Sequence, residues 1–312
     1  MLSAYTSSDL EETNIHRNNR LLLPTCIRIT PFSILCNKNG RIYQGKISAN
    51  PGNAYPRRAT TTQQIRIETQ QPMMIKKALI FAAGKGTRLK PFTDAHPKAL
   101  AQVNQIPLLE RNITYLQSFG IQHFVINIHH FGSQIIDFLK EKNNFGANIE
   151  WSDEREELLE TGGGLVFAKK FLEQEENFLI MNADILTDLN IKNFIDFHLK
   201  TNNLATLAVS DRESSRKLLF NDEMTLKGWV NKTTGEQRLA CFNEDFRELA
   251  FSGIHCLNSR IFKKIKRTGK FSIMEEYLDL MTEYSIKGYQ HNALLIDVGR
   301  PESITEAEKY FV

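Results

Sequence analysis

The residues with the clearest capacity for chemistry form a glycine-rich turn. It runs Ala82-Ala83-Gly84-Lys85-Gly86-Thr87-Arg88-Leu89-Lys90-Pro91 and directly follows an apolar stretch. Because glycine has no Cβ, such a turn leaves backbone N–H groups free and lets an anion approach closely. Arg88 adds a fixed cationic fork. We interpret the turn as a phosphate-binding loop, with a purely structural turn as the alternative.

Two common phosphate motifs do not match this turn. A Walker A loop ending at Gly84-Lys85 would need glycine at Leu79 and serine or threonine at Gly86. A dinucleotide-binding fingerprint would need a third small residue where Leu89 stands. The sequence therefore argues against simple kinases and dehydrogenases.

Two further segments have the composition of ligand-binding elements. Lys98, in Pro97-Lys98-Ala99-Leu100, is interpreted as a second phosphate contact, although most lysines are simply exposed on the surface. Glu160-Thr161-Gly162-Gly163-Gly164 is predicted at a helix start, where a nucleobase or ribose could lie against bare backbone. A linker or a helix N-cap is the alternative for this segment.

Two aspartates stand at the ends of predicted strands. Asp184 follows the apolar run 178–181, and Asp297 closes the run 294–296. The carboxyl ends of strands in an open parallel sheet line the ligand crevice, so we expect these carboxylates to converge although 113 positions separate them. Two hard oxygen donors beside a phosphate site suit Mg²⁺. The alternative is that each aspartate caps the helix that follows.

Elements that would position these residues follow from the hydrophobic periodicity. Up to residue 204 the pattern predicts strands at 77–83, 123–128, 148–152 and 178–181, and helices at 106–119, 131–142, 164–173 and 191–200. Beyond it we expect strands at 205–210, 217–220, 225–230, 250–257 and 294–298, and helices at 273–283 and from 301 onward. Buried strands alternating with helices predict an α/β protein with a Rossmann-like, mixed and mostly parallel sheet covered by helices on both faces.

The first 73 residues differ from the rest. They are rich in Asn, Gln, Thr, Arg and Pro and show no lasting period, so we expect a poorly ordered N-terminal extension over 1–73 and a single domain over 74–312. Acidic residues precede the short apolar segment 21–23 and a proline follows it, which argues against a secretion signal. Met73-Met74 directly precedes the first predicted strand, and the native start is expected there.

Composition narrows the class of protein. The chain has 312 residues, 41% of them hydrophobic, and its longest apolar run, 78–83, is far shorter than the roughly 18 residues of a membrane-spanning helix. The cysteines lack CxxC spacing, so we expect no disulfide framework, no zinc site and a cytoplasmic location; they are Cys26, Cys36, Cys241 and Cys256.

Charge is unevenly distributed along the chain. Residues 1–73 hold nine Lys/Arg and four Asp/Glu, which leaves 30 and 32 in the remaining 239 residues. The predicted domain is therefore slightly acidic, and it contains no basic block interleaved with aromatic residues. We expect neither nucleic acid nor a membrane as a partner.

Taken together, these motifs resemble the sugar-1-phosphate nucleotidyltransferases, also called nucleoside-diphosphate-sugar pyrophosphorylases. The most specific stretch is GKGTRLKPFTDAHPKAL with its preceding strand, and the resemblance extends from Met74 to the C-terminus. Within the family, Glu160 to Gly164 and the Asn182-x-Asp184 pair are similar to N-acetylmuramate 1-phosphate uridylyltransferase and to short mannose-1-phosphate guanylyltransferase-like proteins. The resemblance implies a nucleotide-diphospho-sugar transferase fold.

The resemblance also implies roles for individual residues. Arg88 and Lys98 would be the catalytic cations, and Asp184 and Asp297 would bind Mg²⁺. The nucleotide-binding positions would be Ala83, Gly84, Gly86, Thr87, Glu160, Thr161, Gly162 and Asn182. Gly253 would lie against the sugar, and Lys232 or its rival Arg216 would hold the sugar phosphate. The sequence departs from the family at Ala183, where glycine is usual, and at Gln102, where proline is frequent.

The implied reaction is the transfer of a nucleotidyl group from a nucleoside triphosphate, with UTP favoured, to a sugar 1-phosphate. The products would be an NDP-sugar and pyrophosphate, and the reaction would depend on Mg²⁺. A phosphate monoester is already an anionic nucleophile, so no catalytic Ser, Cys or His is needed. The alternatives are a mannose-1-phosphate guanylyltransferase, a phosphocholine-type cytidylyltransferase whose aromatic cage would draw on Trp229 or Tyr284, and a non-catalytic sensor of nucleotides or sugars. The base, the sugar and the oligomeric state are open at this point.

Overall fold

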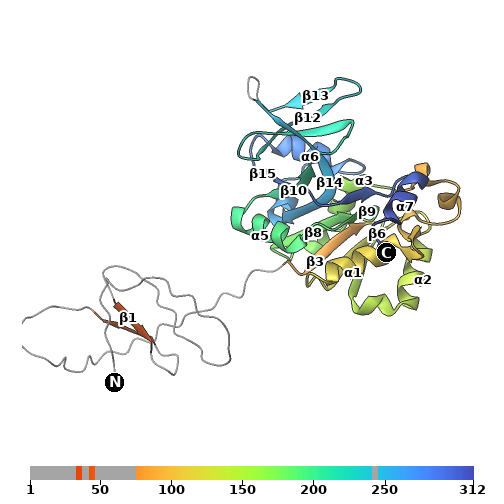
Figure 1. Cartoon of the computed structure of the whole chain (residues 1–312), viewed down its shortest axis with the longest axis horizontal. Coiled ribbons are helices and arrows are strands. Elements are labelled where there is room, and N and C mark those ends of the chain that lie inside the picture. The colour runs from red at the N-terminus through yellow and green to blue at the C-terminus, as the bar shows by residue number, and fades with distance from the viewer. Residues whose placement is uncertain (1–32, 37–41, 46–74, 241–244) are drawn as a thin grey trace, which may run out of the picture. The chain divides into compact units, whose positions relative to one another are not determined.

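The computed structural model describes residues 33–36, 42–45, 75–240 and 245–312 (Figure 1). The chain divides into two compact units, Met1–Gln71 and Pro72–Val312. In the first unit β1 (Ser33–Cys36) pairs antiparallel with β2 (Ile42–Gly45), so the predicted extension contains a short strand pair. The remainder of that extension lies outside the described residues, and its poor order stays a prediction.

Four parallel strands form the centre of the second unit. They lie side by side in the order β7-β6-β3-β8 and comprise β3 (Lys77–Phe81), β6 (His123–Ile128), β7 (Asn148–Asp153) and β8 (Asn177–Asn182). The strands β3, β6 and β8 were predicted from short apolar runs, because a strand buried on both faces carries almost no polar residues. The strand β7 was also predicted, although it is only partly buried. The predicted α/β fold with a Rossmann-like, mixed and mostly parallel sheet is confirmed, with its parallel part in these central strands.

Antiparallel strands extend the same sheet beyond β8 (Figure 1). The twelve-residue β14 (Arg247–Asn258) pairs with β8 and is followed outward by β11 (Arg216–Phe220), β12 (Leu226–Asn231) and β13 (Gln237–Leu239). The strand β10 (Ala205–Ser210) pairs antiparallel with β14 and parallel with β15 (Ile286–Gln290). The long strand β14 thus connects the parallel part of the sheet to its antiparallel part.

Helices cover both faces of the central strands. Alternate side chains of a strand point to opposite faces, and accordingly Ala78 and Ile80 belong to one apolar core while Leu79 belongs to the other. The first core receives residues from α1 (Leu108–Gln117), α2 (Gly132–Glu141) and α5 (Ile191–Thr201). The second receives residues from α3 (Glu160–Phe167), α4 (Lys169–Leu172) and α6 (Ile273–Leu280).

Short elements surround the carboxyl ends of the central strands. The turns η1 (Thr87–Leu89), η2 (Phe92–Asp94) and η3 (Lys98–Leu100) follow β3 and lead to the pair β4 (Gln102–Val103) and β5 (Ile106–Pro107). A separate antiparallel pair joins β9 (Ile185–Thr187) to β16 (Leu295–Asp297), ahead of α7 (Pro301–Ala307). Leu89, Leu186 and Ile296 share a small apolar core, which fixes the turn after β3 against β9 and β16.

Several element boundaries differ from the prediction. The helix expected at 164–173 begins at Glu160 and is divided into α3 and α4 at Ala168. The helix expected at 106–119 begins only at Leu108, because Ile106 and Pro107 pair with β4. The short strands β9, β13 and β15 were not predicted, since none contains a clear alternation of apolar and polar residues.

None of the helices within the described part of the chain combines the length and the apolar character that a bilayer crossing requires.

Candidate active site

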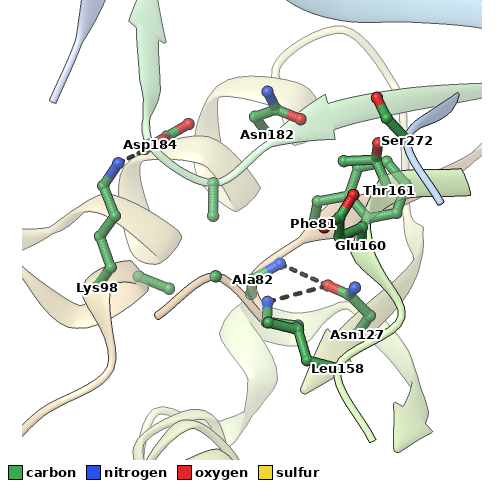
Figure 2. Close-up of a pocket in the computed structure, with 14 residues that line it drawn as sticks. Phe81, Ala82, Lys98, Asn127, Leu158, Glu160, Thr161, Asn182, Asp184 and Ser272 are labelled. Atoms are coloured by element: carbon green, nitrogen blue, oxygen red, sulfur yellow. Dashed lines mark hydrogen bonds and ion pairs between the residues drawn. The ribbon is translucent and has the colours of Figure 1, made fainter. Parts of the chain in front are cut away.

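The glycine-rich turn leaves the sheet where β3 ends at Phe81. Its first two backbone N–H groups do not point freely toward a ligand: Ala82 and Ala83 donate them to Oδ1 of Asn127, at 2.6 and 3.2 Å (Figure 2). Asn127 lies near the end of the neighbouring strand β6 and is 3% exposed. Its side chain therefore fixes the direction in which the turn begins.

Gly86 allows the turn to fold back against η3. Its φ of 61° lies in the left-handed region, and a Cβ there would stand 2.9 Å from both Lys98 Cβ and Thr93 Cγ2. Thr93 and Leu89 donate to the Gly86 carbonyl oxygen, from Oγ1 at 2.9 Å and from the backbone at 2.8 Å. The predicted glycine at 86 is thus needed for packing, and this packing positions Lys98.

Lys98 is not a surface lysine. Its side chain is 11% exposed, and its Nζ forms an ion pair with Asp184 Oδ2 (Figure 2). The same Nζ lies 3.9 Å from Asp297 Oδ1. Arg88 stands on the open side of this group, 57% exposed, with Nη2 4.0 Å from Asp297 Oδ2. Both predicted cations and both predicted carboxylates therefore meet in one cluster.

The backbone explains why Asp184 and Asp297 converge. Asp184 occupies the turn between β8 and β9, and Asp297 is the register partner of Ile185 in the β9–β16 pair. Val298 donates its backbone N–H to the Asp184 carbonyl oxygen at 2.8 Å. The predicted convergence is confirmed, but the predicted geometry is corrected: β16 lies outside the ten-stranded sheet, and an antiparallel pair brings the residues together rather than two parallel strand ends.

Electrostatic conditions differ between the two ends of this cluster. Partial burial and the neighbouring Asp184 carboxylate raise the pKa of Asp297 above its ordinary value. The cations Lys98, Arg88 and Arg212 act in the opposite direction, in that order of strength. Additional positive charge beside Asp297 would therefore favour its ionised form.

The carboxylate pair fits a magnesium ion that is shared with a substrate. Among the described residues no group of three or more His, Cys, Asp or Glu side chains could hold a metal ion by itself. Asp184 and Asp297 supply two hard oxygen donors around the Lys98 ammonium. Mg²⁺ is usually held by one or two carboxylates, with phosphate oxygens and water completing its shell.

A cavity of about 360 Å³ opens between the glycine-rich turn, the start of α3 and the end of β8 (Figure 2). It is lined by Phe81, Ala82, Ala83, Gly84, Lys98, Ala99, Asn127, Leu158, Glu160, Thr161, Asn182, Ala183, Asp184 and Ser272. Both partners of the Lys98–Asp184 pair line this cavity, as does Ala183, which stands where glycine is usual in the family. Five of the predicted nucleotide-binding residues also line it: Ala83, Gly84, Glu160, Thr161 and Asn182.

A second cavity of about 250 Å³ adjoins the first. The two share Phe81, Thr161, Asn182 and Ser272, and the second is completed by Arg216, Leu218, Trp229, Phe251, His255, Ile273 and Met274. Its walls come mostly from the antiparallel part of the sheet and from α6. One elongated molecule can therefore reach from the Lys98 cluster, along Asn182, to Arg216.

Some predicted residues lie behind the cavity walls. Gly162 donates its N–H to the Phe271 carbonyl oxygen at 2.9 Å, and a Cβ on it would come within 2.3 Å of the Phe271 ring. Gly253 has a φ of 74°, and its Cβ would stand 3.1 Å from Asn182 Nδ2. Gly162 therefore packs against Phe271, the residue before Ser272 of the cavity wall, and Gly253 packs against the lining residue Asn182. Thr87 is exposed on the turn.

The structure separates the two rivals for the sugar phosphate. Lys232 is half-exposed and paired with Glu248 at 2.8 Å, and it lines neither cavity. Arg216 lines the second cavity. Of the two aromatic residues considered for a cage, Trp229 lines this cavity, whereas the Tyr284 ring has Lys264 Nζ above it at 4.8 Å.

Four residues near the site were missed from the sequence: Asn127, Glu154, Arg212 and Ser272. Asn127 carries the same signal that identified Asp184, a polar residue toward the end of an apolar strand, and this signal could have found it. Ser272 is the N-cap of α6, and its position directly before the predicted helix, with Glu275 three residues later, indicates a helix start but not a cavity. Arg212 lies in the loop after β10, and no pattern in the sequence indicates its place. Arg212 donates from Nη2 to the Phe251 carbonyl oxygen at 2.9 Å, and its charge lowers the pKa of Asp297.

Known proteins share this architecture. An N-acetylmuramate alpha-1-phosphate uridylyltransferase from Neisseria meningitidis is 29% identical over 242 residues, which cover 74% of this chain and 96% of that protein. A mannose-1-phosphate guanyltransferase from Aspergillus fumigatus is 27% identical over 72% of this chain, but the match spans only 61% of its own length. Among solved structures, HddC from Yersinia pseudotuberculosis complexed with GMP-PN superposes with a TM-score of 0.64 at 24% identity, covering 76% of this chain and 100% of that one.

The family model for nucleotidyl transferases matches residues 77–311, almost all of the second unit. This range includes the glycine-rich turn, the Lys98 cluster and both cavities. The chain belongs to the nucleotidyl transferase family and is an enzyme of the sugar-1-phosphate nucleotidyltransferase group.

Proposed function

We propose that this enzyme transfers a uridylyl group from UTP to a sugar 1-phosphate, with release of pyrophosphate and with Mg²⁺ as its metal. The observation that carries the proposal is the junction of two cavities at Phe81, Thr161 and Asn182. The first cavity adjoins the glycine-rich turn and Lys98, which suits a nucleoside triphosphate. The second has aromatic walls and Arg216, which suits a sugar ring that carries an anionic group.

In the proposed reaction a phosphate oxygen of the sugar 1-phosphate attacks the α-phosphorus of the nucleotide. A new O–P bond forms in line with the bond to the β-phosphate, which breaks and leaves with its electron pair as pyrophosphate. Lys98 and Arg88 are placed to neutralise the charge that develops on the phosphate oxygens. The attacking oxygen is already anionic, so the protein has to position the reactants rather than remove a proton.

Asp184 and Asp297 would hold Mg²⁺, and a bound magnesium would supply further positive charge to the phosphates. For this the Lys98 ammonium has to share the two carboxylates or exchange one of them for a phosphate oxygen. Arg212 adds a cation beside Asp297 and stands near Phe251 in the wall of the second cavity, where an acceptor phosphate would pass.

UTP is favoured over GTP because one relative that this chain covers almost throughout its length is a uridylyltransferase. The guanyltransferase relatives are slightly less similar, and this chain spans only part of them. Ala183 stands in the wall of the first cavity and narrows it by one methyl group compared with glycine. Because of these guanyltransferase relatives, guanylyl transfer to mannose 1-phosphate is the second candidate function.

The test is a matrix of the four ribonucleoside triphosphates against a set of sugar 1-phosphates and phosphocholine, with pyrophosphate release as the readout. Turnover with UTP and any of the sugar 1-phosphates supports the proposal. Turnover with GTP and mannose 1-phosphate alone assigns the second candidate, and turnover with CTP and phosphocholine contradicts both. Nucleotide binding without turnover in any pair would identify a sensor.

A further inference from the structure

Two buried polar side chains connect opposite walls of the first cavity. Asn127 Oδ1 accepts from the Ala82 and Ala83 N–H groups, and Asn127 Nδ2 donates to Glu154 Oε1 at 3.0 Å. The other oxygen of Glu154, Oε2, accepts from the backbone N–H of Leu159 at 3.5 Å. This chain of hydrogen bonds runs from the turn after β3, across the end of β6, to the residue before α3.

The direction of every hydrogen bond in this chain is fixed. Asn127 faces two backbone donors on one side, so its carbonyl oxygen must point toward Ala82 and Ala83 and its amide nitrogen toward Glu154. Glu154 in turn must present acceptors to both Asn127 and Leu159, which an ionised carboxylate does. If the Asn127 amide were flipped, its NH2 group would face the Ala82 N–H group at 2.6 Å, donor against donor.

Glu154 is an unusual residue to find inside the protein. It is 2% exposed, it pairs with no lysine or arginine among the described residues, and burial raises its pKa while the bonds from Asn127 and Leu159 oppose that rise. A Cβ on Gly164 would come within 2.8 Å of Glu154 Oε1, so the glycine helix start is built around this carboxylate. A buried carboxylate is costly unless its hydrogen bonds are made, and here they tie two loops together.

We propose that Asn127 and Glu154 are positioning residues that lock the glycine-rich turn and the Leu158–Thr161 segment at one separation for the nucleotide. Neither residue has to touch a reacting atom for this role. The proposal rests on the proposed function only in naming a nucleoside triphosphate as the occupant of the first cavity. Loss of the connection should raise the dissociation constant of the triphosphate, because the entropy lost in ordering both walls would then oppose binding.

The hydrogen bond between residues 127 and 154 can be reversed in direction while every other hydrogen bond of the connection is kept. In Asn127→Asp the new carboxylate still accepts from Ala82 and Ala83 but meets the Glu154 carboxylate, where like charges repel. In Glu154→Gln the side chain cannot accept from Asn127 and Leu159 at the same time, since one of its ends is a donor. In the double variant the introduced amide donates to the introduced carboxylate and accepts from the Leu159 N–H, so every bond is restored.

The experiment measures triphosphate binding by calorimetry, at one pH and magnesium concentration, for the wild type, both single variants and the double variant. We expect Asn127→Asp to weaken binding about tenfold or more, roughly 1.4 kcal/mol, and Glu154→Gln to weaken it by a smaller factor. Adding Glu154→Gln to Asn127→Asp should instead strengthen binding. The effect of Glu154→Gln on binding should thus be opposite in the wild type and in Asn127→Asp, and this reversal identifies the hydrogen-bonded connection. If the Glu154 charge acted only by repelling the phosphates, Glu154→Gln would strengthen binding in both proteins.

A second readout needs no nucleotide. Hydrogen exchange at residues 82–90 and 155–161 should speed up together in Asn127→Asp and return toward wild type in the double variant. Thr206→Val is the matched control: it removes a buried hydrogen bond to His198 Nδ1, at 2.8 Å, away from both cavities. It should lower the thermal midpoint without changing nucleotide binding or exchange in these two segments.

The outcomes separate the two proposals. A double variant that has the thermal midpoint of the wild type but binds as weakly as Asn127→Asp overturns the positioning role. So does exchange that speeds up in only one of the two segments. If the wild type binds none of the four triphosphates, the proposed function fails, and coupled exchange of the two segments still supports the connection between them.

Discussion

The Lys98 ammonium forms an ion pair with Asp184, the residue that the sequence suggests as a metal ligand. A lysine in this position keeps two neighbouring carboxylates compatible with one another while no other cation is present. It also links the glycine-rich turn to the carboxylates, because Lys98 packs against Gly86. The two cations and the two carboxylates therefore form one charge cluster, and the first two predictions follow from it.

Replacement of Lys98 by methionine should reduce kcat/KM on the order of 10² or more, similar to removal of one electrostatic donor in other active sites. The thermal midpoint should fall as well, because Asp184 and Asp297 lose the cation between them. Lys192→Met provides the control, since Lys192 pairs with Asp196 on the surface of α5. Steady-state rates equal to wild type in Lys98→Met would remove this lysine from the mechanism.

Asp184→Asn and Asp297→Asn should each raise the magnesium concentration required for half-maximal rate. Both changes act on one ion, so the double variant should be scarcely slower than the worse single variant. Magnesium titrations of the three variants test this. If the carboxylates only capped helices, asparagine would substitute well, and full activity of a single variant at low magnesium would contradict a shared ion for that residue.

Arg216→Ala should raise the KM for the sugar 1-phosphate by about tenfold, the loss of roughly 1.4 kcal/mol of contact with an anion, and leave the KM for the triphosphate nearly unchanged. Lys232→Ala is matched in charge and should change neither value, because Lys232 is paired with Glu248 outside both cavities. The measurement is a pair of substrate saturation curves for each variant. The reverse pattern would restore Lys232 as the phosphate contact.

A chain shortened to begin at Met74 should keep the rate and the thermal midpoint of the full chain. The compact unit that contains every described site residue begins at Pro72, and the first strand of its sheet begins at Lys77. Calorimetry and initial rates of the two chains provide the comparison. A midpoint many degrees lower for the shorter chain would show that residues 1–73 stabilise the enzyme.

Stability should fall when the pH is lowered from about 6.5 to about 4. Burial lowers the pKa of His198 to about 4, so between these values the unfolded chain binds a proton that the folded chain does not. Stability is then complete above the unfolded pKa and decreases as the pH falls toward the folded pKa, by about 3 kcal/mol for this residue. Burial lowers the pKa of His255 to about 3, which adds to the effect.

Urea unfolding of the wild type and of His198→Gln at several pH values tests this assignment. Glutamine can still bond to Thr206 and Asn177, the partners of His198, but does not titrate. The variant should lose stability less steeply below pH 6.5. His123→Gln, at an exposed position, should follow the wild-type curve, and a His198→Gln curve parallel to wild type would assign the pH dependence elsewhere.

The central strands and the Lys98 cluster were predictable for the same reason. Strands buried on both faces consist almost entirely of apolar residues. A polar residue directly after such a run, as Asp184 is, lies at the end of the sheet where ligands bind in this class of fold. The glycines of α3 were interpreted as open backbone for a ligand, whereas the structure buries them. A Cβ on Gly163 would stand 2.2 Å from the Gly269 carbonyl oxygen, and that neighbour is distant in the sequence.

Other features depend on tertiary contacts that no local pattern encodes. Which of Lys232 and Arg216 lines a cavity depends on the register of β11 against β12, in which Arg216 pairs with Asn231. The position of Asp297 required the pairing of β16 with β9 instead of the central sheet. Glu154 follows a strand that is only partly buried, and its role depends on Asn127, 27 positions earlier.

The pairing of β14 has a consequence for how this enzyme could be given new substrates. Strands β11 to β13 carry Arg216, Leu218 and Trp229, and they join the sheet through the ladder of Leu218 to Phe220 with β14. The walls of the first cavity include residues of β3, β6 and β8, on the other side of β14. The meander β11–β13 supplies three of the seven residues that only the second cavity contains. Under the proposed function, we expect that exchanging this meander for that of a relative changes the preference for the acceptor more than the preference for the nucleotide.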